Sequence, residues 1–307
     1  MRAPEVSVVV PCYNGGHFLD RMLGSLANQT FRSFEIVVVD DGSTDPDTQA
    51  RLARLGGQVR VVCQSNKGLP AARNTGFREA RAPLILPLDC DDALEPEFLQ
   101  KAVDILQQKS HNTVFAFTHM RVTGLLSGVM PRHFNFFDQL FLNQLPYCML
   151  MPKTIWDSVG GYDETMRDGY EDWEFNIRLA AAGFEGVEIP EPLFVYFVAD
   201  EGMFMSRSAL RHGAIWRIIR RKHAHLYTWP ELRRRRAGSG PGRISVAKAF
   251  GLLAAAEILP DRWFGRLYRW QLLAAHRRRG LRAASEVQDL FRSVPTSSAT
   301  RSASAKK

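Results

Sequence analysis

The stretch APLILPLDCDDALEP, residues 82–96, decides the fold and the chemistry that we expect of this chain. Its apolar run at 84–88 is short and lies between breakers, so it predicts a buried strand, which ends at Asp89, Asp91 and Asp92. Carboxylates this close repel one another, and a set of oxygen ligands favours a hard divalent ion such as Mg²⁺ or Mn²⁺. A solvated acidic turn is the alternative. We favour the metal site because open α/β sheets bind ligands beyond the carboxyl ends of their strands.

A strand, a helix and a second strand come earlier in the chain. The β-branched run at 6–10 predicts a strand covered on both faces, apolar residues at helical spacing over 18–26 predict a helix, and 34–39 is again rich in β-branched residues. This order is a βαβ unit, which places the carboxyl ends of both strands at one edge of a parallel sheet. Tyr13 and Asp41 follow these ends and are expected to face one crevice, unless Tyr13 is only a loop aromatic and Asp41 only a turn residue.

A third strand is predicted over 58–64, and a loop at 66–69 leads from it into a helix that contains Arg73. The start of a helix offers free backbone N–H groups, so with an arginine nearby this end suits an anion such as a diphosphate. A solvated position for Arg73 on the helix surface is the competing interpretation. Further along the chain, we expect a helix over 98–108 and a strand over 113–119.

A second acidic cluster, Glu171 and Asp172, lies in the first turn of a helix that Gly183 is predicted to end. Acidic residues are favoured at a helix N-terminus for dipole reasons alone, which is the simplest interpretation. The same dipole keeps a carboxylate ionised, and an ionised carboxylate beside a bound metal complex can take a proton from an alcohol. The preceding aromatic stretch 121–147 is either a substrate lid or, more simply, core packing.

The composition describes a globular protein. The chain of 307 residues is 45% apolar, enough for one large domain or two smaller ones. Its four cysteines form no C-x-x-C pair, so they indicate neither a zinc site nor a disulfide scaffold and fit a reduced cytosolic setting. The N-terminus enters a strand directly, so no signal peptide is expected, and no apolar run is long enough to span a bilayer. We therefore expect a cytoplasmic protein.

Charge divides the chain into two parts. Residues 1–200 hold 17 lysines and arginines against 26 acidic residues, a net charge of −9, whereas residues 201–307 hold 23 against 6, a net charge of +17. An acidic body suits a metal-dependent site, and a basic C-terminal part suits an anionic surface such as phospholipid or nucleic acid. We place the first domain at 1–210, a basic helical region at 211–292 and a disordered tail, rich in Ser, Ala and Lys, at 293–307.

Within the basic region, helices are predicted over 244–259 and 262–279, after a Gly-rich linker at 237–242. The second helix interleaves aromatic residues and arginines, a pattern typical of a helix in a lipid headgroup layer. Two interpretations stay open. Residues 211–292 either make peripheral contact with an anionic membrane or form a small bundle that packs on the first domain with its arginines solvated.

Five motifs occur in a fixed order along the chain, and each is weak alone. They are VSVVVPCYNGG (6–16), IVVVDDGSTD (36–45), NKGLPAARNTGF (66–77), LPLDCDD (86–92) and GGYDE (160–164) followed by YEDWEFNIRLAAAG (170–183). In this order and spacing they make the chain resemble the inverting family 2 glycosyltransferases over roughly its first 200 residues. The resemblance implies the GT-A fold, an α/β, Rossmann-like nucleotide-sugar-binding fold with a mostly parallel central sheet flanked by helices, here with a basic helical C-terminal extension.

The resemblance also implies which residues bind the nucleotide. Pro11 and Tyr13 would line the base pocket, and Asp41 would accept a hydrogen bond from the base or ribose. Arg73 would lie near the base and diphosphate, and Asp89 would contact the ribose.

The remaining roles implied by the resemblance belong to the two acidic clusters. Asp91, together with Asp89, would hold a Mn²⁺ or Mg²⁺ ion that bridges the diphosphate oxygens, and Asp92 would support that loop. Asp172 matches the general base of the family, and Glu171 beside it would orient the acceptor. One base without an enzyme nucleophile implies a single displacement with inversion.

The chain departs from the family pattern in two places. Pro87 cannot donate a hydrogen bond to a neighbouring strand, so that strand is expected to end early or to bulge. Beyond Phe197 the family often carries an Arg or His that grips the diphosphate, and here Arg207 and His212 are the nearest substitutes. The chain also lacks a Q-x-x-R-W signature, which argues against a processive synthase.

We therefore predict an inverting, metal-dependent transfer of a sugar from a nucleotide-diphosphate sugar, with UDP as the expected nucleotide. The acceptor would be a hydroxyl of a saccharide or lipid-linked molecule in cell-envelope polysaccharide, lipopolysaccharide or glycolipid synthesis, at the cytoplasmic face of the inner membrane. A nucleotidyltransferase is one alternative, although residues 11–16 lack the arginine usual in its first loop. A nucleic-acid binder acting through the basic end is another, but no recognised motif supports it and no nucleic acid partner is expected.

Overall fold

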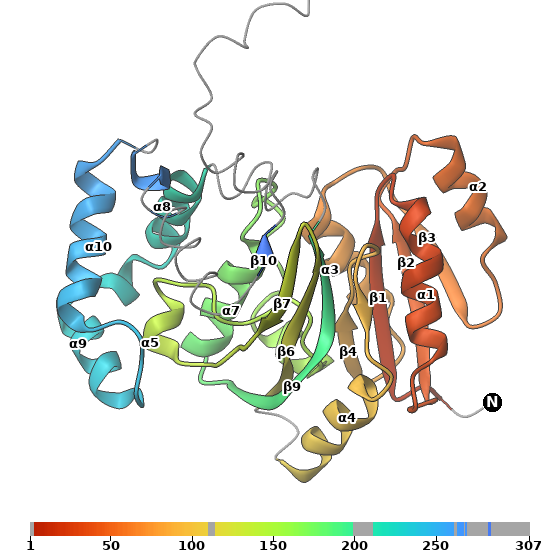
Figure 1. The fold of residues 1–307 in the computed structure, drawn as a ribbon, viewed down its shortest axis with the longest axis horizontal. Helices are drawn as coiled ribbons and strands as arrows, with labels where there is room; N and C mark the ends of the chain where they lie inside the picture. Colours follow the sequence, from red (N-terminus) through yellow and green to blue (C-terminus); the bar gives the residue numbers. More distant parts are fainter. Residues whose placement is uncertain are drawn as a thin grey trace, which may run out of the picture.

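A computed structural model gives the fold and describes residues 3–109, 114–198, 211–260, 263–266, 268 and 282–283. Two five-stranded sheets lie beside each other, and a group of helices from the C-terminal part lies on the side away from the N-terminus (Figure 1). The α/β fold class predicted from the sequence is confirmed. The two acidic clusters, at residues 89–92 and 171–172, lie where the two sheets and the helices meet.

The first sheet consists, in spatial order, of β3 (Val59–Cys63), β2 (Phe34–Asp40), β1 (Val6–Cys12), β4 (Leu84–Pro87) and β8 (Met151–Pro152). The first four strands pair in parallel, and β8 pairs with β4 in the antiparallel direction. The carboxyl ends of the parallel strands therefore share one edge, as the βαβ order predicts. β4 ends at its proline, as expected for a residue without a backbone N–H.

Helices cover both faces of this sheet, because alternate residues of a strand point to opposite sides. Val8 of β1 belongs to a core that includes Met22 of α1 (Leu19–Ala27), whereas Val9 belongs to a second core with Phe77 of α3 (Leu69–Glu79). All the residues of β1 are buried, as expected for a strand covered on both faces. The other elements around this sheet are η1 (Gly16–Phe18), α2 (Pro46–Arg54) and α6 (Lys153–Ser158).

The second sheet is mixed. In spatial order it contains β10 (Arg282–Ala283), β7 (Leu126–Met130), β6 (Val114–Gly124), β9 (Glu185–Val198) and β5 (Ala93–Leu94). β6 and β9 run parallel with a shift of register between Thr118 and Met120, and the other pairs are antiparallel. Helix α4 (Phe98–Gln108) contacts β6 and β9. β6 is longer than the strand predicted over 113–119, because it continues as the first strand of a hairpin with β7.

The basic helices pack against the rest of the chain. They are α8 (His212–Lys222), η3 (Ala224–Tyr227), α9 (Trp229–Gly238) and α10 (Val246–Ile258). Ile215, Trp216 and Leu232 share a buried cluster with Phe137 of α5 (Phe136–Gln139) and Trp173 of α7 (Glu171–Ala181). The aromatic stretch before α7 thus contributes to the core, and these helices pack on the rest of the chain, which leaves contact with a membrane untested.

Several predictions for the C-terminal part fall on residues of uncertain placement. The helix expected at 244–259 is present as α10, whereas only 263–266 and 268 of the one expected at 262–279 are described, and these are helical. The tail at 293–307 lies outside the described residues. The domain boundaries at 210 and 292 stay predictions.

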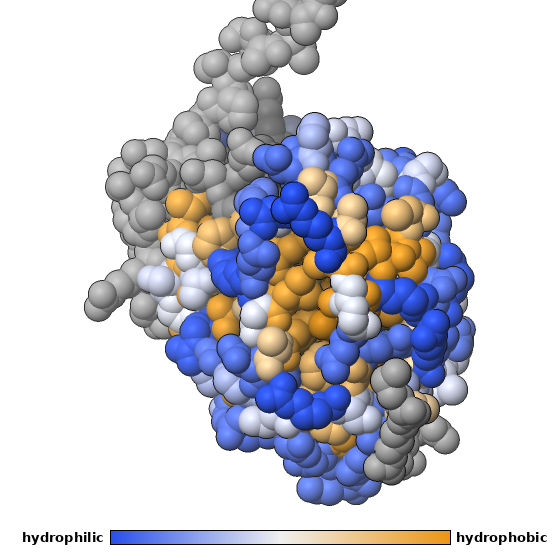
Figure 2. Space-filling view, turned by 90° about the vertical axis from the view of Figure 1, so that its right-hand side faces the viewer, coloured by the Kyte–Doolittle hydropathy of each residue, from blue (hydrophilic) through white to orange (hydrophobic). Residues whose placement is uncertain are grey.

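The side of the molecule formed by α1, α2 and β3 has an apolar centre within a hydrophilic rim (Figure 2). β3 is an edge strand, and its Val59, Val61 and Val62 are half-buried. No described helix combines the length and the apolar character needed to cross a membrane.

Candidate active site

The first acidic cluster, Asp89, Asp91 and Asp92, lies between β4 and β5, beyond the carboxyl edge of the first sheet. One carboxylate oxygen of each lies within 4.8 Å of those of the other two. Burial and then repulsion from Asp89 raise the pKa of Asp91 to about 6, and burial raises the pKa of Asp92 well above its usual range. A divalent cation would relieve this crowding, so the oxygen donors present fit the ion predicted from the sequence.

Tyr147 and Phe197 fix the position of this acidic turn. The Tyr147 hydroxyl donates a hydrogen bond to Asp92 Oδ2 and accepts one from the backbone N–H of Asp89 at 2.9 Å. The second oxygen of Asp92 accepts the backbone N–H of Phe197 at 2.7 Å. Because both oxygens of Asp92 are held from within the protein, this residue supports the turn, as its predicted role requires.

Arg73 connects the first acidic cluster to the second. Its side chain is 1% exposed, so it does not lie on a solvated helix face. Nη2 donates to both oxygens of Asp89 at 2.8 and 2.9 Å, and Nη1 donates to Glu171 Oε1 at 2.7 Å. The guanidinium lies 4.6 Å from the ring centroid of Tyr147. One buried arginine therefore sets the distance between the predicted metal ligands and the start of α7.

The second acidic cluster opens α7. Asn143 Nδ2 donates a hydrogen bond to Asp172 Oδ2 at 2.8 Å. Burial raises the pKa of Asp172, and burial, opposed by Arg73, raises the pKa of Glu171 to about 7. A carboxylate with a raised pKa is a stronger base than an ordinary aspartate, which suits Asp172 to accept a proton. The predicted role of Glu171 in orienting an acceptor stays untested, and in the structure its carboxylate engages Arg73.

The residue before these carboxylates has an unusual backbone. Tyr170 has φ 63° and ψ 17°, in the left-handed region that bulky residues avoid. Such a conformation costs on the order of 1–3 kcal/mol and persists where the surroundings impose it. Here the Tyr170 hydroxyl and His212 Nδ1 are hydrogen-bonded at 3.0 Å, and the rings of Tyr170 and Trp173 meet edge to face at 5.4 Å. The aromatic packing thus holds the start of α7.

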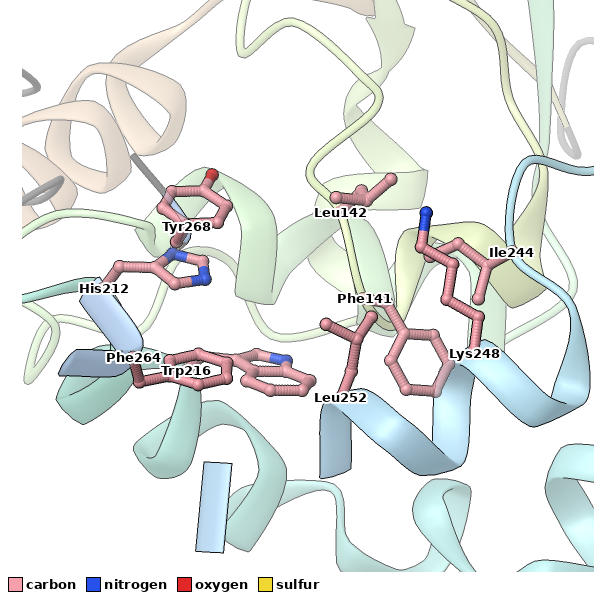
Figure 3. Close-up of a pocket in the computed structure, with 9 residues that line it drawn as sticks. All are labelled: Phe141, Leu142, His212, Trp216, Ile244, Lys248, Leu252, Phe264 and Tyr268. Carbon is pink, nitrogen blue, oxygen red and sulfur yellow. The ribbon is translucent and has the colours of Figure 1, made fainter. Parts of the chain in front are cut away.

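His212 is 2% exposed and forms part of a stack of rings around a cavity of about 30 Å³ (Figure 3). Its ring is nearly parallel to those of Trp216, Phe264 and Tyr268, with interplanar angles of 16°, 8° and 2°. Burial lowers the pKa of His212 to about 3. A buried neutral imidazole cannot grip a diphosphate, so His212 does not substitute for the family residue, and Arg207 lies outside the described residues.

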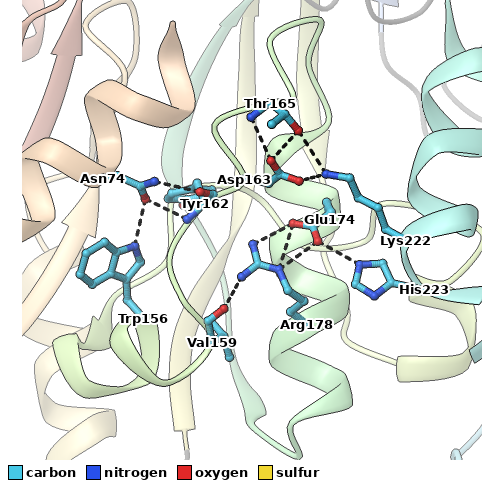
Figure 4. A network of polar contacts seen from close by, with 10 residues as sticks. All are labelled: Asn74, Trp156, Val159, Tyr162, Asp163, Thr165, Glu174, Arg178, Lys222 and His223. Carbon is cyan, nitrogen blue, oxygen red and sulfur yellow. Dashed lines mark hydrogen bonds and ion pairs between the residues drawn. The ribbon is translucent and has the colours of Figure 1, made fainter. Parts of the chain in front are cut away.

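Asn74, next to Arg73 on α3, holds the segment that leads into α7 (Figure 4). Its side-chain amide donates to the Tyr162 carbonyl and accepts the Tyr162 backbone N–H, both at 2.8 Å. It also accepts from Trp156 Nε1 at 3.3 Å. On α7, Arg178 pairs with Glu174 of the same helix and donates to the Val159 carbonyl. Asn74 of α3 and Arg178 of α7 therefore hold the same segment, residues 156–162.

The predicted nucleotide residues at the first two strand ends lie in adjacent loops. Asn14 Oδ1 accepts the backbone N–H groups of Thr44 and Asp45 at 2.8 and 2.9 Å, which joins the loops after β1 and β2. Tyr13 is 50% exposed on the first loop, directly after the buried end of β1.

Asp41, on the second loop, is buried and holds the approach to α3. It accepts the backbone N–H groups of Lys67 and Gly68, each at 2.8 Å, and Gln64 Nε2 at 2.7 Å. Pro11 is buried within β1 opposite Val39. The binding roles of Pro11, Tyr13 and Asp41 stay predictions.

Sequence reasoning missed Tyr147, Asn143 and Asn74. The first two lie in the aromatic stretch 121–147, where no periodicity indicated which side chains point toward the acidic clusters. A tyrosine and an asparagine among apolar neighbours were the available signal, because buried polar groups need partners.

Comparisons with known proteins identify the family and the fold of this chain. The model of the family described as "Glycosyl transferase family 2" matches residues 7–166, which is more than half of the chain. The putative glycosyltransferase EpsH of Bacillus subtilis (strain 168) is 39% identical over 103 residues, covering 33% of this chain and 30% of that protein. The chondroitin synthase of Escherichia coli is 27% identical over 189 residues, covering 59% of this chain and 27% of that protein. The chain thus matches about a third or less of the length of these relatives.

Two solved structures share the fold. S. aureus TarS 1-349 in complex with UDP-GlcNAc has a TM-score of 0.58 at 22% identity, covering 70% of this chain and 65% of that one. The mannosyltransferase PcManGT from Pyrobaculum calidifontis, in complex with GDP-Man and Mn²⁺, has a TM-score of 0.54 at 19% identity, covering 95% and 84%. The predicted GT-A fold is confirmed, and with the family match over residues 7–166 the chain belongs to glycosyl transferase family 2.

Proposed function

We propose that this chain transfers a sugar from a nucleotide-diphosphate sugar to an acceptor hydroxyl, with inversion and with a divalent cation. The observation that carries the proposal is the pairing of buried Arg73 with Asp89 on one side and Glu171 on the other. This pairing fixes a cluster of carboxylates suited to a cation beside a helix that begins with a candidate base. Family membership favours this reaction over nucleotidyl transfer and over nucleic-acid binding.

In this proposal Asp91 and Asp89 would hold Mn²⁺ or Mg²⁺, which when bound stabilises negative charge on the departing diphosphate. Asp92 keeps the turn in place through Tyr147 and Phe197. The PcManGT structure, which contains Mn²⁺ with GDP-Man, supports the use of a divalent ion.

Asp172 accepts the proton of the acceptor hydroxyl as that oxygen attacks the anomeric carbon. Asn143 fixes the orientation of the carboxylate through its hydrogen bond to Oδ2. Burial raises the pKa of Asp172 and so makes this carboxylate a stronger base. Since the reaction uses one base and no enzyme nucleophile, it is a single displacement that inverts the configuration at the anomeric carbon. An α-linked donor therefore gives a β-glycoside.

We propose UDP as the nucleotide, which the TarS complexes with UDP and UDP-GlcNAc support by similarity of fold. The binding residues would be Pro11, Tyr13, Asp41, Arg73 and Asp89. The acceptor would be a saccharide or lipid-linked hydroxyl in cell-envelope polysaccharide, lipopolysaccharide or glycolipid synthesis, and the reaction would take place on the cytoplasmic side of the inner membrane.

The direct test replaces the proposed base. Asp172→Asn should lower the rate of transfer, or of nucleotide-sugar hydrolysis, at least about a hundredfold, because general base catalysis typically contributes that much or more. Binding of UDP with Mn²⁺ should stay within about threefold of wild type, since the amide keeps the shape of the carboxylate. Asp157→Asn, an exposed position on α6, is the matched control. An Asp172→Asn protein with wild-type turnover would contradict the assignment.

We also propose that the basic helices contact an anionic membrane surface. Large apolar side chains are exposed there, with Trp229 at 48%, Ile258 at 78% and Trp263 at 48%. Arginines lie over two of these rings, Arg233 at 5.4 Å from Trp229 and Arg266 at 4.6 Å from Trp263. Exposed tryptophans beside arginines suit the headgroup layer of a membrane.

Sedimentation with vesicles tests this contact. The full chain should bind vesicles that contain phosphatidylglycerol and not vesicles of phosphatidylcholine alone, and added salt should weaken binding. The double variant Trp229→Ser and Trp263→Ser should lose most of the binding, whereas Val129→Ser, at an exposed apolar residue of β7, should keep it. Equal binding to both kinds of vesicle, or equal binding by the double variant, would contradict the proposal.

A further inference from the structure

Two histidines and a glutamate form a cluster of metal-ligating side chains distinct from the aspartate cluster. His119, His133 and Glu188 each place one ligand atom within 4.8 Å of those of the other two. His119 Nε2 lies 2.8 Å from Glu188 Oε1, and His133 Nδ1 lies 2.8 Å from Glu188 Oε2. The two imidazole rings are 5.7 Å apart and nearly perpendicular, at 82°. Both oxygens of one carboxylate are therefore shared between two histidines.

Three separate segments build this cluster. His119 lies on β6 at the shift of register between Thr118 and Met120, and Glu188 lies on the parallel strand β9. An irregularity of this kind re-aims a side chain that would otherwise follow the alternation of the strand. His133 comes from the segment between β7 and α5. The chain thus departs from regular pairing at the residue that completes the cluster.

We propose that His119, His133 and Glu188 bind a borderline transition-metal ion of the zinc type. Imidazole nitrogens and a carboxylate oxygen are typical zinc ligands, with metal–ligand distances of about 2.0–2.2 Å. Tetrahedral ligands at such distances lie about 3.4 Å apart, and one ligand atom of each of the three side chains already lies within 4.8 Å of the others, so a small movement of the side chains would admit an ion. The His133 side chain is 51% exposed, which leaves room for water as the fourth ligand.

The two clusters would select different ions. Asp89, Asp91 and Asp92 offer oxygen alone, which suits Mg²⁺ and Mn²⁺, whereas imidazole nitrogen favours zinc and its neighbours. Excess Mg²⁺ therefore occupies the aspartates without competing strongly for the histidines. This difference allows the second ion to be measured in the presence of the first.

An ion at this position would brace the segment that supports the proposed base. Arg132, next to His133, donates to Met120 Sδ at 2.8 Å and to the Asn143 carbonyl at 3.4 Å. Asn143 in turn donates to Asp172. The ion would join β6, β9 and this segment, and it would act on the reaction by positioning alone.

Binding of zinc to the full chain tests the proposal. Metal-free protein in excess Mg²⁺ is titrated with Zn²⁺ alone in a calorimeter, and the expected result is one tight site per chain. His133→Ala and Glu188→Gln should each weaken that site at least about tenfold, since even outer-shell changes at metal sites cost ten- to a hundredfold. His225→Ala, at an exposed histidine of η3, and Asp91→Asn should leave it unchanged.

Thermal unfolding gives a second readout that does not depend on activity. Zn²⁺ should raise the unfolding midpoint of wild type and of His225→Ala, because an ion that binds only the native state stabilises it, and should not raise that of His133→Ala. Since His133 is exposed, its loss should leave the fold intact, which circular dichroism checks. Absence of a tight site, equal affinity in His133→Ala, or loss of the site in Asp91→Asn would overturn the proposal and leave an ordinary hydrogen-bonded cluster.

Discussion

Burial of His212 should make the stability of the protein depend on pH in a way that can be calculated. The pKa of His212 falls from its ordinary value of 6.5 to about 3, because burial disfavours the imidazolium. Below about pH 6.5 the His212 imidazole is protonated in the unfolded chain and stays neutral in the native protein, so the free energy of unfolding falls as the pH falls. The contribution is fully present above 6.5 and is lost at about 1.4 kcal/mol per pH unit down to about 3. Between about pH 7.5 and pH 5 the loss is about 2 kcal/mol.

His212→Phe isolates this contribution. The phenyl ring keeps the stack with Tyr268 and Trp216, but it removes the imidazole partner of the Tyr170 hydroxyl, which keeps its hydrogen bond with Tyr268. Loss of one hydrogen bond costs about 0.5–1.5 kcal/mol, so at about pH 7.5 the variant should be less stable than wild type by that amount. At about pH 5 wild type has lost about 2 kcal/mol through protonation of His212 in the unfolded chain, a loss that the variant does not have, so the variant should then be the more stable by about 0.5–1.5 kcal/mol.

Urea unfolding followed by tryptophan fluorescence, at both pH values, measures the difference. The tyrosines around His212 do not titrate in this range, and effects of other groups cancel between the two proteins. His225→Phe, at an exposed histidine, should show the pH dependence of wild type. If His212→Phe also kept that dependence, His212 would not be buried and neutral, and the packing of α8 on α7 would be wrong.

Two further predictions concern packing and the acidic turn. Gly76→Ala should destabilise the protein by about 1–3 kcal/mol in urea unfolding, because its Cβ would lie 2.1 Å from Val9 Cγ1 between α3 and the sheet. Gly24→Ala, on α1 with nothing within 4 Å, should instead stabilise it by about 0.5–1 kcal/mol, and equal effects would contradict the packing. Tyr147→Phe should lower the affinity for Mn²⁺ about tenfold or more in a calorimetric titration, because Asp92 loses its hydroxyl donor. Unchanged affinity would show that the turn held by Tyr147 does not support the metal site.

The sequence was sufficient for the features that depend on local pattern. Runs of valine predicted the parallel strands, and the parallel order placed Asp89, Asp91 and Asp92 at one edge of the sheet with the loop that contains Asp41. Asp45, a residue type favoured at this position, caps α2 and accepts the backbone N–H of Thr48 at 2.8 Å.

The sequence was insufficient where partners are distant along the chain. Arg73 and Glu171 are separated by 98 residues, and no local rule states that a predicted diphosphate ligand pairs with two carboxylates. His119 lies next to Glu188 at a shift of register in β6, and no turn residue in the sequence predicts that shift. The burial of His212 depends on aromatic residues from several helices, each of which looked like ordinary core or surface by itself. Such pairings are decided by tertiary packing, which periodicity does not specify.

The central claim is that the carboxylates near position 90 bind a divalent ion needed to hold the nucleotide. Calorimetric titration of UDP with and without Mn²⁺, in wild type and Asp91→Asn, tests it most directly, with Asp47→Asn on the exposed surface of α2 as the control. Mn²⁺ should tighten UDP binding at least about tenfold in wild type and the control, and should have no effect in Asp91→Asn. If Asp91→Asn bound UDP with the same dependence on Mn²⁺ as wild type, the metal site would lie elsewhere and the account would fail.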